Sequence, residues 1–140
     1  MTEEFFDAIR DNNITKVQEF LDSGVDVDVR DKWGDTALIL AFEWRCPEII
    51  KLLIEAGADV NARNENEWGD TALMLAVKCD YVEIAKLLIE KGANVEAMDI
   101  SKRTVLMLAA FEGRIQMVRL FIEKGADFDV KDKWGCTALM

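Results

Sequence analysis

The chain has 140 residues, is 51% hydrophobic, and carries 27 acidic against 17 basic residues, which gives a formal net charge of −10. This charge repels nucleic acid phosphates and anionic lipid headgroups, so we expect neither a nucleic acid partner nor membrane association. Histidine is absent, which removes the usual general base at neutral pH and the commonest zinc ligand.

Two series of similar segments recur along the chain. In the first, a glycine is followed by a small or branched residue and then by an acid or amide, at Gly24, Gly57, Gly92 and Gly125, which are 33, 35 and 33 residues apart. In the second, a threonine opens an apolar run, at Thr36, Thr71, Thr104 and Thr137, which are 35, 33 and 33 residues apart. Because two series that are out of phase keep the same period, the chain consists of one supersecondary unit copied several times.

Each unit is predicted to contain two helices. The first begins at the threonine, and the second ends at the glycine, where a left-handed backbone costs little only for glycine. Pro47 opens one second helix at a position where no amide donor is needed. The predicted helices cover Thr36 to about Trp44, 47–55, 71–78, 82–90, 104–111 and 115–123. An apolar stripe in the second helices marks core positions, at Ile49, Leu52 and Leu53, then Ile84, Leu87 and Leu88, then Met117, Leu120 and Phe121.

A period near 33, a threonine-led helix and a tail such as Gly57-Ala58-Asp59-Val60-Asn61 resemble the ankyrin repeat. The resemblance implies an all-α fold, an ankyrin-type helix-turn-helix solenoid with β-hairpin tips, in a single domain over residues 1–140. It divides the chain into an N-terminal capping repeat over 1–30, full repeats over 31–63, 64–98 and 99–131, and a truncated fifth repeat over 132–140. The proline and histidine of the family pattern are replaced, for example by Ala37 and Ile39, so we expect apolar packing in place of the histidine's hydrogen bonds.

The two ends of the array differ from its middle. In the first repeat, Asp7, Lys16 and Glu19 align with Leu40, Ile49 and Leu52, and polar residues at such positions are what a solubilising cap requires. At the other end, the single helical turn that Thr137 opens is too short to cover the apolar stripe of the fourth repeat. We therefore expect that stripe to be uncovered, with residues 132–140 poorly ordered or ordered by weak self-association.

The sequence predicts no enzymatic activity, no cofactor and no metal site. Cys46, Cys79 and Cys136 are odd in number and far apart, unlike a disulfide framework or a metal knuckle, and no activating partner is prescribed for them. The repeated aspartates fail the spacing of a calcium loop and indicate turns instead. Without a secretory leader or an apolar run long enough to span a bilayer, the expected location is the cytoplasm.

Large aromatic residues indicate where a partner protein would bind. Trp33, Trp68 and Trp134 take the same place at the predicted hairpin tips, where the fourth repeat has Ser101. In the ankyrin family, hairpin tips and first helices line a groove in which partners dock. The matching candidate residues are Trp33, Asp35, Glu43, Trp44, Trp68, Asp70, Lys78, Cys79, Arg103, Phe111 and Trp134.

Acidic residues are expected to form a solvated rim around these aromatic anchors, at Asp35, Glu43, Glu65, Glu67 and Asp70. Such a surface favours a protein partner with apolar side chains flanked by lysine or arginine. The two additional residues within 64–67 lengthen one hairpin and could set the register of that partner. Two alternatives remain open. The indoles could merely brace adjacent hairpins, and the chain could serve as a spacer or as the first part of a longer repeat protein.

Overall fold

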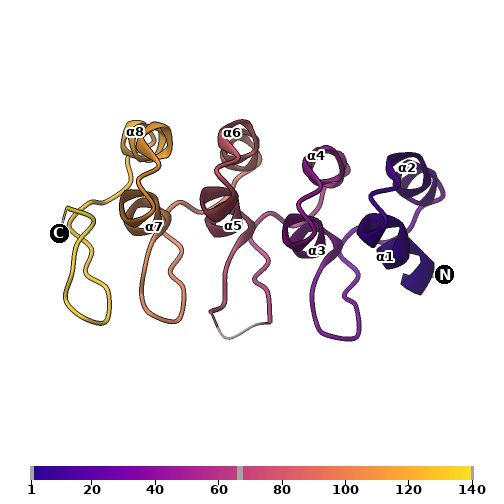
Figure 1. Ribbon diagram of the computed structural model, residues 1–140, viewed down its shortest axis with the longest axis horizontal. Helices are drawn as coiled ribbons and strands as arrows, with labels where there is room; N and C mark the ends of the chain where they lie inside the picture. The colour runs from indigo at the N-terminus through magenta and orange to yellow at the C-terminus, as the bar shows by residue number, and fades with distance from the viewer. Residues whose placement is uncertain (1, 66–67, 140) are drawn as a thin grey trace.

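The computed structural model describes residues 2–65 and 68–139 (Figure 1). The described residues form eight helices, namely α1 (Thr2–Arg10), α2 (Ile14–Asp22), α3 (Ala37–Glu43), α4 (Pro47–Glu55), α5 (Ala72–Cys79), α6 (Val82–Glu90), α7 (Val105–Phe111) and α8 (Ile115–Glu123). The helices form antiparallel pairs that stand side by side in a row, and the loops between pairs all project along one edge (Figure 1). The predicted all-α solenoid is confirmed. The second helices of the full repeats have the predicted bounds, and the first helices lie within about a residue of them.

The first helices of the three full repeats begin one residue after the threonine because the threonine is the N-cap. The hydroxyl oxygens of Thr36, Thr71 and Thr104 accept hydrogen bonds from the backbone N–H three residues later, at 3.3, 3.4 and 3.4 Å. At the position of the family's histidine, Ile39 and Met74 are fully buried. The Met74 sulfur also accepts a hydrogen bond from the Thr71 N–H at 3.5 Å. The expected replacement of histidine by apolar packing is confirmed.

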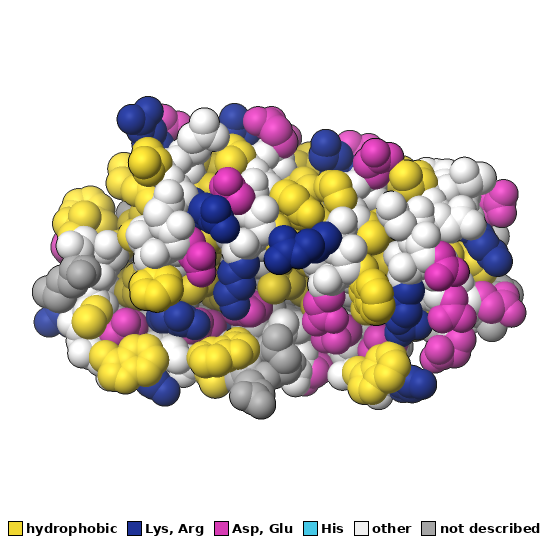
Figure 2. Space-filling view, in the orientation of Figure 1, with side chains coloured by type: hydrophobic (Ala, Val, Ile, Leu, Met, Phe, Trp, Pro, Cys, Tyr) yellow, Lys and Arg dark blue, Asp and Glu magenta, His cyan; other side chains and the backbone are white. Residues whose placement is uncertain are grey.

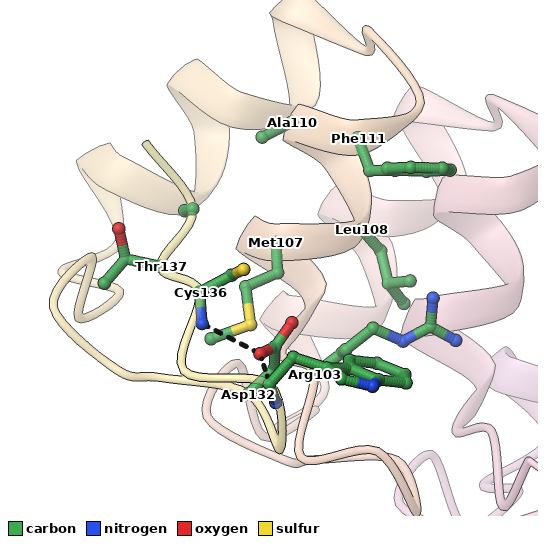
Figure 3. Close-up of a pocket in the computed structure, with 10 residues that line it drawn as sticks. Arg103, Met107, Leu108, Ala110, Phe111, Asp132, Cys136 and Thr137 are labelled. Carbon is green, nitrogen blue, oxygen red and sulfur yellow. Dashed lines mark hydrogen bonds between the residues drawn. The ribbon is translucent and has the colours of Figure 1, made fainter. Parts of the chain in front are cut away.

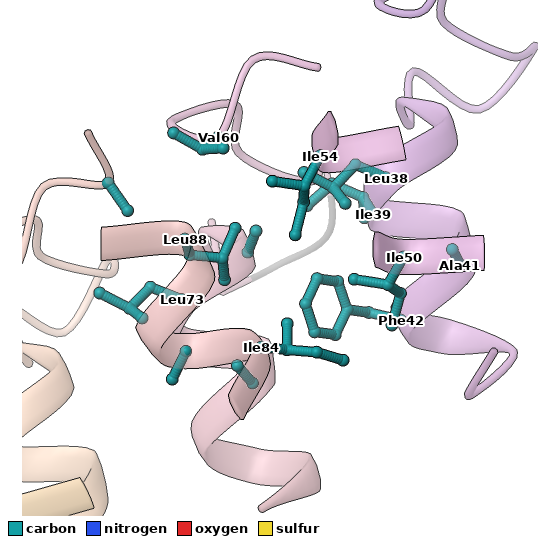
Figure 4. Packing of buried hydrophobic residues seen from close by; sticks show 14 of the residues in the cluster. Leu38, Ile39, Ala41, Phe42, Ile50, Ile54, Val60, Leu73, Ile84 and Leu88 are labelled. Carbon is teal, nitrogen blue, oxygen red and sulfur yellow. The ribbon is translucent and has the colours of Figure 1, made fainter. Parts of the chain in front are cut away.

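The core runs without a break along the row of helix pairs. Within each pair the two helices pack on one another, while α3 also packs on α1 and α5, and α4 on α2 and α6. Figure 4 shows this between the second and third pairs, where Phe42 and Ile54 lie in the same apolar cluster as Ile84 and Leu88. Every pair therefore depends on its neighbours for burial, as a solenoid requires.

The loops on the free edge, which we call the tip loops, contain less β-structure than predicted. Among the described residues they contain only single β-bridges, Arg30 to Thr36 and Arg63 to Thr71, in place of β-hairpin ladders. Carboxylates hold the loops instead. Asp31 Oδ1 accepts hydrogen bonds from the N–H groups of Trp33 and Asp35 at 2.9 and 3.0 Å. Asp99 and Asp132 accept hydrogen bonds from the equivalent backbone N–H groups in their own tip loops. The prediction that the repeated aspartates form turns is confirmed.

A second set of polar residues links consecutive repeats, and the sequence did not predict it. Asp28 Oδ1 accepts a hydrogen bond from the N–H of Asp59 at 2.7 Å, and Asn61 Oδ1 accepts one from Asn94 at 2.8 Å. Glu96 Oε1 accepts the next one, from the Asp127 N–H, at 2.9 Å. These bonds join the segments that follow the second helices, so they tie consecutive repeats together.

At the N-terminal end, Asp7, Lys16 and Glu19 are all exposed, as the predicted capping role requires. The capping function itself stays a prediction. Asn66 and Glu67, in the lengthened tip loop of the third repeat, and Met140 lie outside the described residues.

The expectation for the C-terminal end is wrong in one respect. Met117, Leu120 and Phe121 are buried, because this side of α8 packs on α7 and α6 within the existing repeats. The side chains left exposed at this end are instead Ile122, Phe128 and Leu139. Residues 132–139 attach to the preceding tip loop through a hydrogen bond from the Lys133 N–H to the Ser101 carbonyl at 3.0 Å, an arrangement that the sequence did not predict.

We predict that alanine at Gly92 destabilises the protein. Gly92 has φ of +95°, and a Cβ built there meets no atom within 4 Å, so the cost comes from backbone strain alone. A left-handed backbone costs a residue with a Cβ about 1–2 kcal/mol, and asparagine tolerates it better. The midpoint of urea unfolding should therefore be lowest for Gly92→Ala, intermediate for Gly92→Asn and highest for wild type. Equal midpoints for wild type and Gly92→Ala would contradict this reasoning.

Candidate partner-binding surface

Exposed aromatic side chains follow the tip loops and the C-terminal ends of the first helices. Trp33, Trp44, Trp68 and Trp134 are 45 to 63% exposed, and Phe111 is 84% exposed. Figure 2 shows hydrophobic side chains gathered in separate patches along the edge that the tip loops form. Aromatic groups of this size are usually buried, and when exposed in a row they are typical of a surface that binds another molecule.

Cations already contact the tryptophans of the tip loops. The ammonium of Lys32 lies 4.5 Å from the ring centre of Trp33, and the Arg10 guanidinium lies 5.4 Å from it. Arg103 lies 5.5 Å from the Trp68 ring, and Lys133 lies 4.8 Å from that of Trp134. Arg10 and Arg103 each lie in a repeat next to that of the tryptophan they contact, so these two contacts link consecutive repeats. They leave about half of each indole exposed, so bracing accounts for only part of the surface of each ring.

Asp70 does not belong to the expected solvated rim, and this prediction is corrected. Its side chain is 2% exposed, and its Oδ2 pairs with the Lys78 ammonium at 2.7 Å. Its N–H donates to the Asn64 side chain at 2.8 Å. Asp70 lies just before α5, between Asn64, which it contacts, and Lys78, whose ammonium reaches back to it from two turns further along the chain. Both residues therefore help to hold the third repeat together, and Asp70 is not available to a partner.

The other candidate residues lie on the surface to different degrees. Glu43 is exposed, whereas Asp35, Lys78, Cys79 and Arg103 are half-buried. Arg103 is also engaged internally, because its Nε donates to Asp99 Oδ2 at 2.9 Å.

Four carboxylates gather between the first two tip loops and the end of α3, and we call them the acidic cluster: Asp31, Asp35, Glu43 and Glu65. Asp35 Oδ1 accepts a hydrogen bond from the Glu65 N–H at 3.3 Å, which joins the two tip loops. Burial, followed by the charges of Asp31 and Glu65, raises the pKa of Asp35 above its ordinary value. Burial, followed by the charges of Asp35 and Asp31, raises the pKa of Glu43. Burial and the neighbouring carboxylates thus disfavour the ionised forms of Asp35 and Glu43.

Three cations from consecutive repeats surround Cys79, and we call them the basic cluster: Arg45, Lys78 and Arg114. Burial raises the pKa of the Cys79 thiol, while the three positive charges oppose that rise. Arg114 bridges two repeats, because its Nε and Nη2 donate to the carbonyls of Val77 and Lys78 at 3.3 and 3.2 Å. A half-buried thiol with a raised pKa is a poor nucleophile at neutral pH.

A hollow of about 390 Å³ lies between α7 and the loop of residues 132–139. Met107, Leu108 and Phe111 line one side of it, and Asp132 and Cys136 line the other (Figure 3). The N–H of Cys136 donates to Asp132 Oδ1 at 2.9 Å and fixes the loop wall. The sequence indicated Phe111 and Trp134 as separate candidates. It did not predict the hollow, because its walls come from two repeats whose separation only the fold defines.

Models of the ankyrin repeat family match this chain. The family described as ankyrin repeats in three copies matches residues 5–99, and the family described as ankyrin repeats in many copies matches 80–122 and 107–140. The chain therefore belongs to the ankyrin repeat family, whose repeats are typically protein interaction modules and usually non-catalytic.

Several curated proteins resemble the chain over part of its length. Ankyrin repeat and SOCS box protein 5 of Bos taurus is 46% identical over 48 residues, which is 34% of this chain and 14% of that protein. Ankyrin repeat domain-containing protein 29 of Danio rerio is 43% identical over 61 residues, which is 43% of this chain and 20% of that protein. Mitochondrial disaggregase of Bos taurus is 40% identical over 55 residues, which is 39% of this chain and 8% of that protein. The matches thus span a fifth or less of each relative.

Across residues 2–65 and 68–139, none of the helices has the length and apolar character that crossing a membrane requires.

We predict that Lys78→Met destabilises the protein by about 1–3 kcal/mol, because it leaves the buried Asp70 carboxylate without its charged partner. The double variant Asp70→Asn with Lys78→Met should recover part of the loss, since a neutral amide costs less to bury. Lys86→Met is the matched control, because Lys86 pairs with Glu83 at 3.4 Å on an exposed helix face. That control should change the free energy of unfolding by less than about 1 kcal/mol. Similar losses for Lys78→Met and Lys86→Met in urea titrations would contradict the assignment.

We predict that Glu43→Gln raises the thermal unfolding midpoint at pH 7. Because the folded-state pKa of Glu43 is raised, the wild type gains relative stability below the unfolded value of about 4.5 and loses it as pH rises through the folded pKa. The advantage of Glu43→Gln should therefore be present at pH 7 and absent below pH 4.5. Glu55→Gln, which also alters the last residue of a helix, controls for the helix dipole and should give a smaller gain. Equal effects of the two substitutions at pH 7 would show that the cluster does not repel Glu43.

Proposed function

We propose that this chain is a non-catalytic protein-binding module that docks a partner protein along its tip loops and the ends of its first helices. The observation that carries the proposal is the row of exposed aromatic side chains, Trp33, Trp44, Trp68, Phe111 and Trp134, beside carboxylates that are not neutralised. Tryptophan and other large anchors dominate the free energy of many protein interfaces, and clustered carboxylates favour a cationic neighbour. The proposed setting is the cytoplasm, as the sequence predicts.

The partner that fits this surface carries apolar side chains with lysine or arginine close by. An apolar group can pack on the exposed half of an indole, and a cation can lie beside Asp35 and Glu43. The hollow beside Phe111 and Trp134 could receive a further apolar side chain at the far end of the same surface.

A second candidate function is stacking, in which the chain acts as a spacer or as the start of a longer repeat array. The observation that favours it is an apolar hollow of about 250 Å³ at the C-terminal end. Its walls include Leu106, Val118, Ile122, Phe128 and Leu139, on the face where a further repeat or a second copy would pack. Weak self-association through this end is part of the same alternative.

We predict that replacing Trp33, Trp44 and Trp68 together by alanine weakens binding of peptides selected on the wild-type protein by at least about tenfold, since a buried hot-spot tryptophan contributes about 2 kcal/mol or more. Selection from a displayed library of random peptides supplies the ligands, and fluorescence polarisation measures their affinity. In the free protein a neutral quencher should reach the indoles, and the peptide should protect them.

The control replaces Ile122 and Phe128 by alanine, which removes exposed apolar groups only from the C-terminal end. If the peptides lose affinity for this control and not for the tryptophan variant, the stacking surface is the binding site and the proposed docking surface is wrong.

A further inference from the structure

Glu43, Trp44 and Arg45 are consecutive residues that belong to two different electrostatic environments. Helix α3 ends at Glu43, Trp44 follows as its C-cap, and Arg45 takes a left-handed backbone with φ of +52° before α4 begins. The carboxylates of Asp35 and Asp31 act on Glu43, whereas Arg45 acts on Cys79 of α5. The acidic cluster and the basic cluster therefore adjoin the exposed Trp44, which lies between one residue of each in the chain.

The two clusters keep unbalanced charge of opposite sign. In the acidic cluster, Arg10 pairs with Asp31 at 3.6 Å and Arg30 pairs with Glu65 at 3.5 Å. Among the described residues, Asp35 and Glu43 have no ion pair. Asp35 and Glu43 therefore lack the paired cations that Asp31 and Glu65 have.

In the basic cluster, Lys78 pairs with the buried Asp70, and Arg114 lies 3.7 Å from Asp80. Arg45 is exposed and forms no ion pair with the residues that the structure describes. Figure 2 shows basic side chains gathered near the middle of this face and many acidic ones toward the N-terminal end. The aromatic surface is thus negative on one side of Trp44 and positive on the other.

We infer that the partner segment is bipolar, with a lysine or arginine beside Glu43 and Asp35, an apolar side chain on Trp44, and an aspartate or glutamate beside Arg45. The inference rests on the proposed function and adds to it the order of charges along the partner. A segment that is basic throughout would place a cation against Arg45, and repulsion between like charges at an interface is costly. The opposite charges therefore allow the segment to dock in one direction only.

The spacing of the repeats sets the spacing of these charges. Packed helices lie about 8–10 Å apart, and an extended chain advances about 3.3 Å per residue. The acidic cluster lies beside α3. The basic cluster, to which Arg45 belongs, is centred on Cys79 at the end of α5, one repeat further along. An extended partner segment should therefore carry its positive and negative residues about three positions apart, with the apolar residue between them.

The experiment selects binders from the same displayed library on wild type, Glu43→Lys and Arg45→Glu, and compares the charge pattern of the enriched peptides. Wild type should enrich peptides with a basic and an acidic residue about three positions apart. Glu43→Lys should lose the preference for the basic residue only, and Arg45→Glu the preference for the acidic residue only. A wild-type peptide should bind each variant about 3- to 10-fold more weakly, and reversing the matching charge of the peptide should restore its affinity.

Glu55→Lys and Lys51→Glu are the matched controls, because both change exposed charges of α4 in the same repeat. They should leave the enriched pattern and the affinities unchanged. Peptides that depend on the tryptophans and show no paired charges, or that no charge reversal rescues, overturn the bipolar segment and leave the proposed function standing. If no peptide is enriched, or if enriched peptides ignore the tryptophan substitutions, the proposed function fails and the inference fails with it.

Discussion

Stacking between neighbouring repeats is the constraint on which this structure depends. Each helix has only seven to nine residues, and isolated helices of that length are marginal in water. A helix pair cannot bury its apolar stripe by itself, so Phe42, Ile84 and their equivalents are covered only when the next pair packs on them. The polar bonds follow the same direction, because Asp28 and Asn61 each hold a backbone N–H of the following repeat. Apolar burial and hydrogen bonding thus both act along the axis of the array.

Because stability comes from contacts along the axis, the edge and the face that lie beside it are free to carry other side chains. Three of the tip loops need little from their outward residues, since Asp31, Asp99 and Asp132 hold these turns through backbone N–H groups. A tryptophan can therefore stand at the tip without a role in the core. The same reasoning applies to Trp44 and Phe111, which follow or end a first helix after its buried side has been completed.

Much of the fold could be predicted from the sequence because it depends on local features such as helix caps, positive-φ glycines and the repeat period. Thr71 and Thr104 cap the helices they precede, Gly92 adopts a positive φ, and the period of the repeat states the arrangement of the pairs. The candidate surface was predicted less well, because burial depends on which way a side chain turns in three dimensions. Asp70 occupies the same place in its repeat as the half-exposed Asp35, yet it is buried and pairs with Lys78 of the helix that follows it. Phe121 is covered for a similar reason, since its side of α8 faces inward.

Net charge was also a coarse guide to the partner. A total of −10 suggests a uniformly acidic surface that attracts only cations. The fold divides that charge unevenly, because the acidic residues of the first two tip loops come together while Arg45, Lys78 and Arg114, which are 33 and 36 positions apart in the sequence, converge on Cys79. The net charge does not reveal such local excess. Because salt screens exposed charges beyond about 8–10 Å, a docked segment interacts mainly with the charges close to it. Specificity in this molecule would then come from the order of charges along the array, and an array of repeats is well suited to display such an order because each repeat contributes one position in a fixed sequence.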